Sequence, residues 1–110
     1  MTVNKKAVKT AGIFFRRLLK DPEIRLRYQQ ERARTEIAMA VVAARKRACL
    51  TQAELAKKAG TTQGVIARLE SGRDSRVPSM PLLAGIARAC GGIFEFGFAF
   101  RKLVRRPLMP

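Results

Sequence analysis

The stretch from Thr51 to Gly72, TQAELAKKAGTTQGVIARLESG, limits the possible folds of this chain more than any other part. Its spacing predicts two short helices joined by a tight turn. Thr51 is followed three residues later by Glu54, the pattern of a capping box in which each side chain bonds a free backbone N–H at the helix start. Gly60 stands where the chain must reverse, because glycine adopts a positive φ at least cost. Thr62 is expected to cap the second helix and Gly72 to end it.

The apolar residues of the two predicted helices leave one face of the second helix pointing outward. The expected inward residues are Leu55, Ala56, Ile66 and Leu69. The expected outward residues are Gln63, Gly64, Ala67 and Arg68. In the first turn of such a helix, Gln63 could bond adenine in a major groove, and Arg68 could reach guanine or a phosphate. The same residues would also suit the solvated face of an ordinary helical hairpin, but the complete spacing from cap to stop favours DNA binding.

This string resembles the helix-turn-helix of the Cro/C1-type (XRE) repressor family, which has a lambda-repressor-like helical bundle. The residues that carry the resemblance are Thr51-Gln52, Leu55-Ala56, Gly60, Gln63, Ile66, Arg68-Leu69-Glu70 and Gly72. The resemblance implies that Gln52 bonds a phosphate and that Gln63, Ala67 and Arg68 contact DNA. We expect the same surface to include Lys57, Thr62, Gly64 and Arg73.

The resemblance also implies a buried ion pair between Glu70 and an arginine just before the motif, a position that Arg45 occupies. A glutamate inside an otherwise apolar run needs such a partner in any case. The family often has glycine or asparagine just before the first motif helix, where this chain has Cys49. A residue with a Cβ makes that turn more costly.

The charge of the chain supports a polyanionic partner. Its 110 residues suffice for one domain, and 23 lysines and arginines stand against 8 acids, a formal net charge of +15. Such a balance suits nucleic acid, since each neutralised phosphate releases counterions, although a membrane surface or an acidic protein could also attract it. No apolar run approaches the roughly 20 residues of a membrane-spanning helix, and the N-terminus lacks the cleavage site of a signal peptide.

Side chains that typically serve in catalytic and metal sites are scarce in this sequence. The chain has no histidine, and neither Cys49 nor Cys90 has a base beside it, so we expect no enzyme activity. Two separated cysteines are too few for a metal site or a disulfide scaffold, which indicates the reducing cytoplasm and no metal or cofactor.

Residues 1–35 are interpreted as an N-terminal helical extension. Its apolar cluster is Ile13, Phe14, Phe15, Leu18 and Leu19, expected on a short helix that ends at Asp21-Pro22. Three interpretations remain open for this basic segment: a frayed tail, an arm on DNA phosphates, and a segment that binds a protein partner, which the aromatic pair favours. A second helix is expected from Asp21 to about Ala48, with a bend or break in the polar stretch 29–36.

Residues 36–92 are interpreted as the DNA-binding domain, which ends with a helix from Ser79 to Gly91-Gly92. Residues 93–110 are interpreted as a dimerisation strand followed by a basic tail. The strand is predicted by the period-two aromatics Phe94, Phe96, Phe98 and Phe100. A single strand in a mainly all-α chain needs a pairing partner, either the same strand of a second subunit or a strand of another protein.

The order of these elements, over about residues 15–102, resembles the HigA-type antitoxins of toxin–antitoxin pairs. That resemblance implies a homodimer that represses its own operon at a palindromic double-stranded operator and holds a RelE/HigB-like mRNA-cleaving toxin. Because the arm is basic, as such toxins are, capture would depend on the cluster Ile13, Phe14, Phe15, Leu18 and Leu19, or on acids of the partner. The alternative is a stand-alone phage or plasmid repressor with the same DNA chemistry and no toxin.

Overall fold

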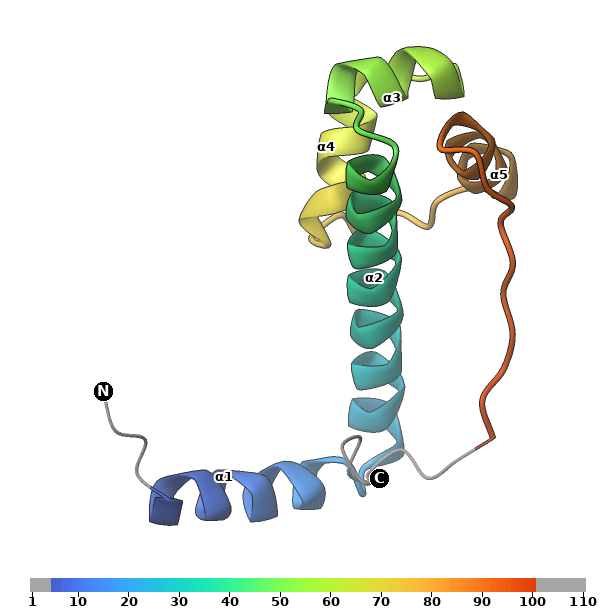
Figure 1. Ribbon diagram of the computed structural model, residues 1–110. Helices are drawn as coiled ribbons and strands as arrows, with labels where there is room; N and C mark the ends of the chain where they lie inside the picture. Colours follow the sequence, from blue (N-terminus) through green and yellow to red (C-terminus); the bar gives the residue numbers. More distant parts are fainter. Residues whose placement is uncertain (1–4, 101–110) are drawn as a thin grey trace. The chain divides into compact units, whose positions relative to one another are not determined.

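Helices make up most of the chain that the computed structural model describes, which is residues 5–100, with side chains from residue 9 onward. The helices of this part are α1 (Lys5–Leu18), α2 (Pro22–Arg47), α3 (Gln52–Ala59), α4 (Gln63–Ser71) and α5 (Met80–Ala89) (Figure 1). The prediction of a mainly all-α chain is therefore confirmed for these residues. The predicted basic tail, residues 101–110, lies outside the described residues. The chain divides into two compact units: the first contains residues 5–31 and 98–100, and the second contains residues 32–97.

In the first unit, α1 and the start of α2 are joined by a short, hydrogen-bonded turn. The Asp21 carboxylate accepts a hydrogen bond of 2.9 Å from the backbone N–H of Glu23 and so caps α2. The Arg25 side chain donates from Nε to the carbonyl oxygen of Leu19 at 2.8 Å. The ring of Phe15 meets the ring of Tyr28 edge to face, with centroids 5.2 Å apart. The turn and the aromatic contact thus tie the end of α1 to the first turns of α2.

The helix α2 is continuous, so the expected interruption between residues 29 and 36 is wrong. This stretch is polar, but it contains neither glycine nor proline, and polarity alone does not break a helix. Its last turn is supported by an ion pair in which Arg32 Nε lies 3.1 Å from Glu36 Oε1, four residues on. Although α2 has 26 residues, neither it nor any other helix within residues 5–100 is long and apolar enough to cross a membrane.

The end of α2 has a left-handed residue at Cys49, with a φ of +57°. The Cys49 N–H donates to the Lys46 carbonyl at 3.0 Å, and the Leu50 N–H donates to the Arg45 carbonyl at 3.1 Å. These two bonds form the Schellman arrangement, in which glycine usually holds the left-handed position. The costly turn expected at Cys49 is thus present, and it leads directly into α3.

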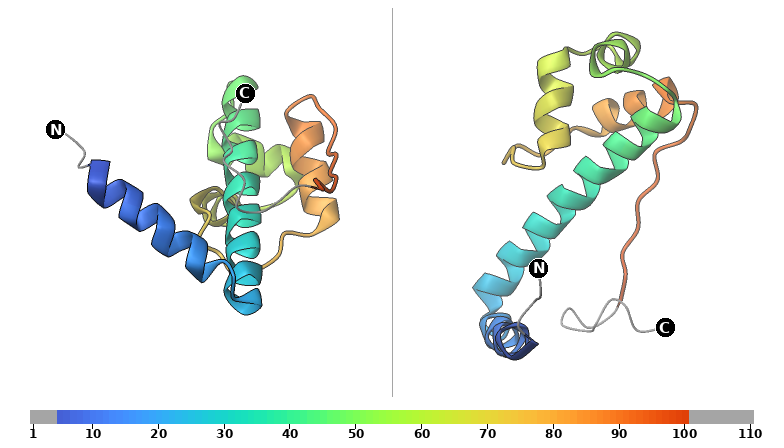
Figure 2. Two further views of the ribbon diagram at one scale, coloured as in Figure 1. Left: turned by 90° about the horizontal axis from the view of Figure 1, so that it is seen from below. Right: turned by 60° about the vertical axis from the view of Figure 1, so that its left-hand side comes forward.

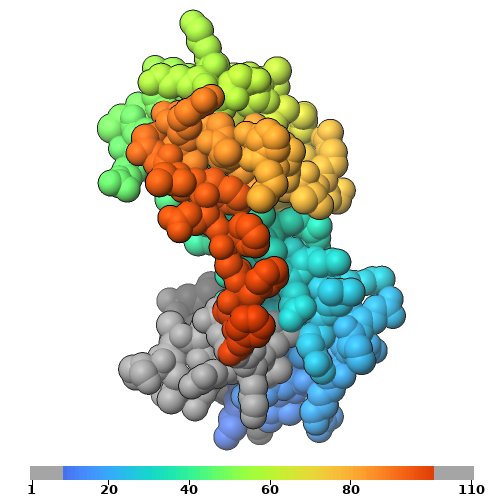
Figure 3. All heavy atoms as spheres, turned by 90° about the vertical axis from the view of Figure 1, so that its right-hand side faces the viewer, coloured from blue at the N-terminus to red at the C-terminus, as the bar shows by residue number. Residues whose placement is uncertain are grey.

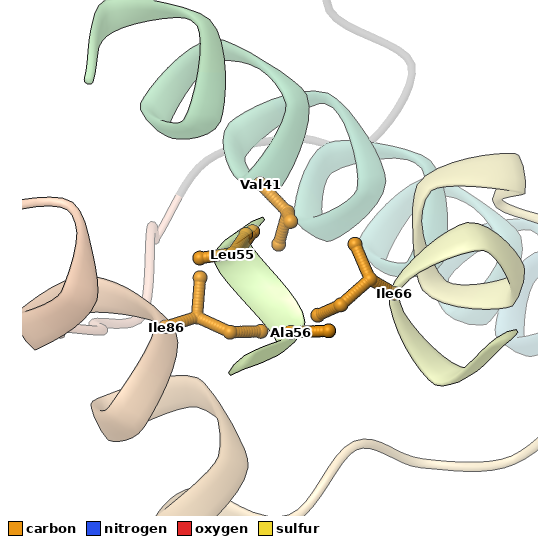
Figure 4. Close-up of a cluster of buried hydrophobic side chains, with 5 residues drawn as sticks. All are labelled: Val41, Leu55, Ala56, Ile66 and Ile86. Atoms are coloured by element: carbon orange, nitrogen blue, oxygen red, sulfur yellow. The ribbon is translucent and has the colours of Figure 1, made fainter. Parts of the chain in front are cut away.

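The core of residues 32–97 surrounds α3, which packs against both α4 and α5. Its buried cluster consists of Val41, Leu55, Ala56, Ile66 and Ile86, whose side chains point toward one another in Figure 4. Leu55 and Ile66 are fully buried, and burial of side chains of this size stabilises a fold by about 1.5–3 kcal/mol each. The predicted inward positions of the two motif helices are therefore confirmed for Leu55, Ala56 and Ile66.

The aromatic segment after α5 forms no strand within residues 5–100. Figure 3 shows the face of the second unit that α5 and the residues following it form. Phe94 is half-buried, whereas Phe96, Phe98 and Phe100 are 70%, 81% and 96% exposed. A strand that pairs with another chain needs that chain, so pairing across a dimer stays a prediction.

Candidate nucleic-acid interface

Local hydrogen bonds set the start and the end of both motif helices. Thr51 and Glu54 form the predicted capping box, in which the Thr51 N–H donates to Glu54 Oε1 at 2.9 Å and the Glu54 N–H donates to Thr51 Oγ1 at 3.1 Å. Gly60 ends α3 with a φ of +74°. Thr62 Oγ1 accepts from the Val65 N–H at 3.3 Å at the start of α4, and Gly72 ends α4 with a φ of +69°. The prediction of two short helices with these caps is confirmed.

The two sides of α4 differ in burial and in chemistry. On its inner side Ile66 is buried, and Val65, Leu69 and Glu70 are half-buried. On its outer side Gln63, Gly64, Arg68 and Ser71 are exposed, and Ala67 is half-buried. The right-hand view of Figure 2 shows α4 at the edge of its unit, with one long side facing away from the other helices. The outer side thus presents small and hydrogen-bonding residues along a helix whose inner side is packed.

A polar cluster beside the core joins α2, α3 and α4. Glu70 receives a bidentate contact from Arg45, with Nε 2.7 Å from Oε2 and Nη2 3.0 Å from Oε1. Gln52 Nε2 donates to the same Oε1 at 3.0 Å, and Arg45 Nη1 donates to the Leu50 carbonyl at 3.0 Å. The side chains of Arg45 and Glu70 are only 16% and 5% exposed. The cluster therefore fixes the last turn of α4 against the end of α2 and the start of α3.

The pKa of the Glu70 carboxyl reflects two opposing effects. Burial raises this pKa because it disfavours the charged form. Hydrogen bonds from Arg45 and Gln52, together with the positive charges of Arg45 and Lys46, outweigh that effect and hold the pKa below 4.5. Glu70 is therefore charged at neutral pH, as a bidentate partner of arginine must be.

The link between Gln52 and Glu70 was not expected from the sequence. The resemblance implied a phosphate contact for Gln52, but one donor of its amide is used inside the protein. A glutamine amide has two N–H donors, so a phosphate contact would have to use the second. The two residues are 18 positions apart, and no local pattern indicates their contact.

A second cluster that the sequence did not indicate surrounds Asp74, in the loop after α4. Asp74 Oδ1 accepts from the Arg76 N–H at 3.0 Å and from Arg76 Nε at 3.1 Å. Asp74 Oδ2 lies 3.7 Å from Arg68 Nε, on the outer side of α4. The hydrogen bond from the Arg76 backbone, followed by that from its side chain, holds the pKa of Asp74 below its usual range. The sequence feature that could have pointed to this cluster is that Asp74 is the one acidic residue between Glu70 and Glu95.

The remaining predicted contact residues occupy the surface. Lys57 and Arg73 are exposed, and the Arg73 backbone N–H donates to Ser71 Oγ at 3.2 Å. In the first unit, Ile13, Phe14 and Phe15 are 45%, 63% and 43% exposed, Leu18 is half-buried, and Leu19 is 2% exposed. The apolar surface of α1 is therefore made by the first three of these five residues.

Comparison with known families supports this geometry. Residues 41–93 match a family model described as Helix-turn-helix, a range that begins in the last part of α2 and extends past α5. No curated protein and no solved structure matches the chain.

Proposed function

Because residues 41–93 form an XRE-type helix-turn-helix of a DNA-binding transcription regulator, we propose that the protein represses transcription by reading a specific operator with α4. The observation that carries the proposal is the two-sided character of α4. Ile66 and Glu70 attach its inner side to the core and to the polar cluster, while Gln63 and Arg68 stand on its exposed side. A helix held in this way can enter a major groove without losing its packing.

The proposed contacts divide by chemistry. Gln63 and Arg68 read base edges, since a glutamine amide pairs with adenine and a guanidinium with guanine. Gly64 and Ala67 let the helix approach closely, and the polar and basic residues around them hold the register on phosphates. These register residues include Gln52, Lys57, Thr62 and Arg73. The formal charge of +15 supports the phosphate contacts.

Replacement of Gln63 by alanine tests the assignment of α4. The probe is a duplex that the wild-type protein enriches from a randomised pool, compared with an unselected duplex of equal length. Gln63→Ala should lose about 1–3 kcal/mol of binding free energy on the selected duplex and little on the unselected one. Gln29→Ala, at an exposed position of α2, is the matched control and should change neither affinity. If the affinity of Gln63→Ala fell equally on both duplexes, Gln63 would be a positioning residue and not a base reader.

We further propose that the repressor acts as a homodimer on a palindrome, with its two α4 helices about 34 Å apart. The support is the aromatic segment 93–100, in which Phe94, Phe96, Phe98 and Phe100 alternate with smaller or polar residues and are largely exposed. Pairing of this segment between two subunits would cover the exposed rings. Deletion of residues 93–110 should shift the protein from dimer to monomer in sedimentation. A truncated chain that still sediments as a dimer would rule out the strand pairing.

For α1 we propose the binding of a RelE/HigB-like toxin in the cytoplasm, which would make the protein a HigA-type antitoxin. The support is the exposure of three consecutive apolar residues, Ile13, Phe14 and Phe15, near the end of a short basic helix. The alternative, a stand-alone repressor, has the same DNA chemistry and needs no partner for α1.

Co-expression with the product of the adjacent gene separates the two. An antitoxin should co-purify with it, and Phe14→Ser should weaken the complex while Leu26→Ser, at another exposed apolar position, does not. An adjacent gene without a RelE-like product, or a complex indifferent to Phe14, favours the stand-alone repressor.

A further inference from the structure

We infer that Asp74 determines how strongly this protein discriminates its operator from other DNA, because its carboxylate competes with DNA phosphates for Arg68 and Arg76. The inference rests on the DNA-binding function proposed above. It assigns a role in DNA binding to an acidic residue, although the chain as a whole is strongly basic.

The contacts show how both arginines are engaged before any DNA arrives. Asp74 contacts Arg76 through a backbone and a side-chain hydrogen bond of 3.0 and 3.1 Å, and Arg68 through an ion pair of 3.7 Å. The side chain of Asp74 is 23% exposed, while those of Arg68 and Arg76 are 50% and 70% exposed. One largely shielded carboxylate therefore lies between two arginines that are themselves open to solvent.

The electrostatic consequence differs between the two kinds of DNA. Binding to arbitrary DNA is driven almost entirely by cations that neutralise phosphates and release counterions. An arginine already paired with Asp74 gains less from a phosphate, because it must exchange one anion for another. Without the Asp74 carboxylate, Arg68 and Arg76 would both be open to phosphates, and the formal net charge would rise by one unit from +15.

On an operator, the same contact assists Arg68. The Nε of Arg68 is the atom that faces Asp74. The Nη1 of Arg68 lies 3.6 Å from the position that a Cβ would occupy on Gly64, so the guanidinium extends along α4 over that glycine. The two Nη groups carry four of the five N–H donors of a guanidinium and are the ones left for a bidentate contact. Asp74 thus orients Arg68 for a base edge while it weakens the attraction of Arg68 to any phosphate.

Asp74→Asn tests the inference, because asparagine keeps the Oδ1 acceptor for the Arg76 N–H and removes the charge. Glu23→Gln is the matched control: it raises the net charge by the same unit and breaks an exposed ion pair, Glu23 with Arg27, in the other unit. Affinities are measured by fluorescence anisotropy for the duplex that the wild type enriches and for an unselected duplex, over a series of salt concentrations. Circular dichroism verifies that each variant is folded, and Asp74→Ser serves as a second variant that keeps an oxygen acceptor.

Asp74→Asn should bind the unselected duplex about three- to tenfold more tightly than Glu23→Gln does, with a salt dependence steeper by about one to two phosphate contacts. Its affinity for the selected duplex should rise less, so that the ratio of the two affinities falls by about three- to tenfold. Arg76→Gln should have little effect in the wild type but should remove part of the gain in the Asp74→Asn background, since Asp74 no longer engages Arg76 there.

Equal behaviour of Asp74→Asn and Glu23→Gln on both duplexes would overturn the inference and leave the proposed function standing. Equal effects of Arg76→Gln in both backgrounds would overturn it as well. A wild-type protein that enriches no sequence from the pool would overturn both the proposed function and the role of Asp74.

Discussion

Replacement of Cys49 by glycine should stabilise this protein, because Cys49 occupies the left-handed position that ends α2 with a φ of +57°. For a residue with a Cβ, the left-handed region costs roughly 1–2 kcal/mol, which glycine avoids. Glycine also gains conformational freedom in the unfolded chain, which reduces the benefit by about 0.4–1 kcal/mol. The difference leaves a net stabilisation of about 0.5–1 kcal/mol for Cys49→Gly.

The side chain of Cys49 contributes little that the substitution would remove. It is exposed, and its Sγ makes one long contact of 4.0 Å, to the Arg47 carbonyl. Cys49→Ala is therefore the matched control, since it removes the sulfur and keeps both the Cβ and the strained φ. This control should leave the free energy of unfolding within about 0.5 kcal/mol of the wild type, as for most surface substitutions.

Thermal unfolding followed by circular dichroism measures the effect. For a domain of this size, 1 kcal/mol corresponds to a shift in Tm of about 4–8 °C, so Cys49→Gly should raise Tm by about 2–8 °C. A Cys49→Gly protein that melts at or below the temperature of Cys49→Ala would refute the argument, because the strain assigned to the turn would then be absent.

Two further substitutions test the core and the polar cluster. Ile66→Ala should lower the free energy of unfolding by about 2–5 kcal/mol in urea titrations, because it opens a cavity at a fully buried position. Val77 is 89% exposed, so Val77→Ala should have almost no effect. Similar losses in the two variants would contradict the burial of Ile66. Because folding lowers the pKa of Glu70 below the ordinary value of a glutamate, the stability that Glu70 contributes is present above that ordinary value and is lost as the pH falls through the folded pKa. Glu70→Gln should therefore be less stable than the wild type at pH 7, with the difference shrinking toward pH 3, and a difference independent of pH would exclude the charged Glu70 as its origin.

The parts of the fold that could be predicted from the sequence are those formed between near neighbours in the chain. Thr51 bonds a residue three positions away, and so does Thr62. Gly60 and Gly72 adopt the positive φ that their positions require. The expected interruption of α2 is wrong because residues 29–36, although polar, contain neither glycine nor proline and include an ion pair between Arg32 and Glu36.

The sequence alone determined that residues 51–72 form two capped helices and that Gln63, Gly64 and Arg68 stand on the outer side of the second. Only the tertiary structure decided that Gln52 donates to Glu70 and that Asp74 lies between Arg68 and Arg76. The physical reason is the range of the interactions. A cap or a helical periodicity depends on residues a turn apart, but the partner of a long polar side chain depends on how α2, α3 and α4 cross, and the packing of Val41, Leu55 and Ile66 sets that crossing.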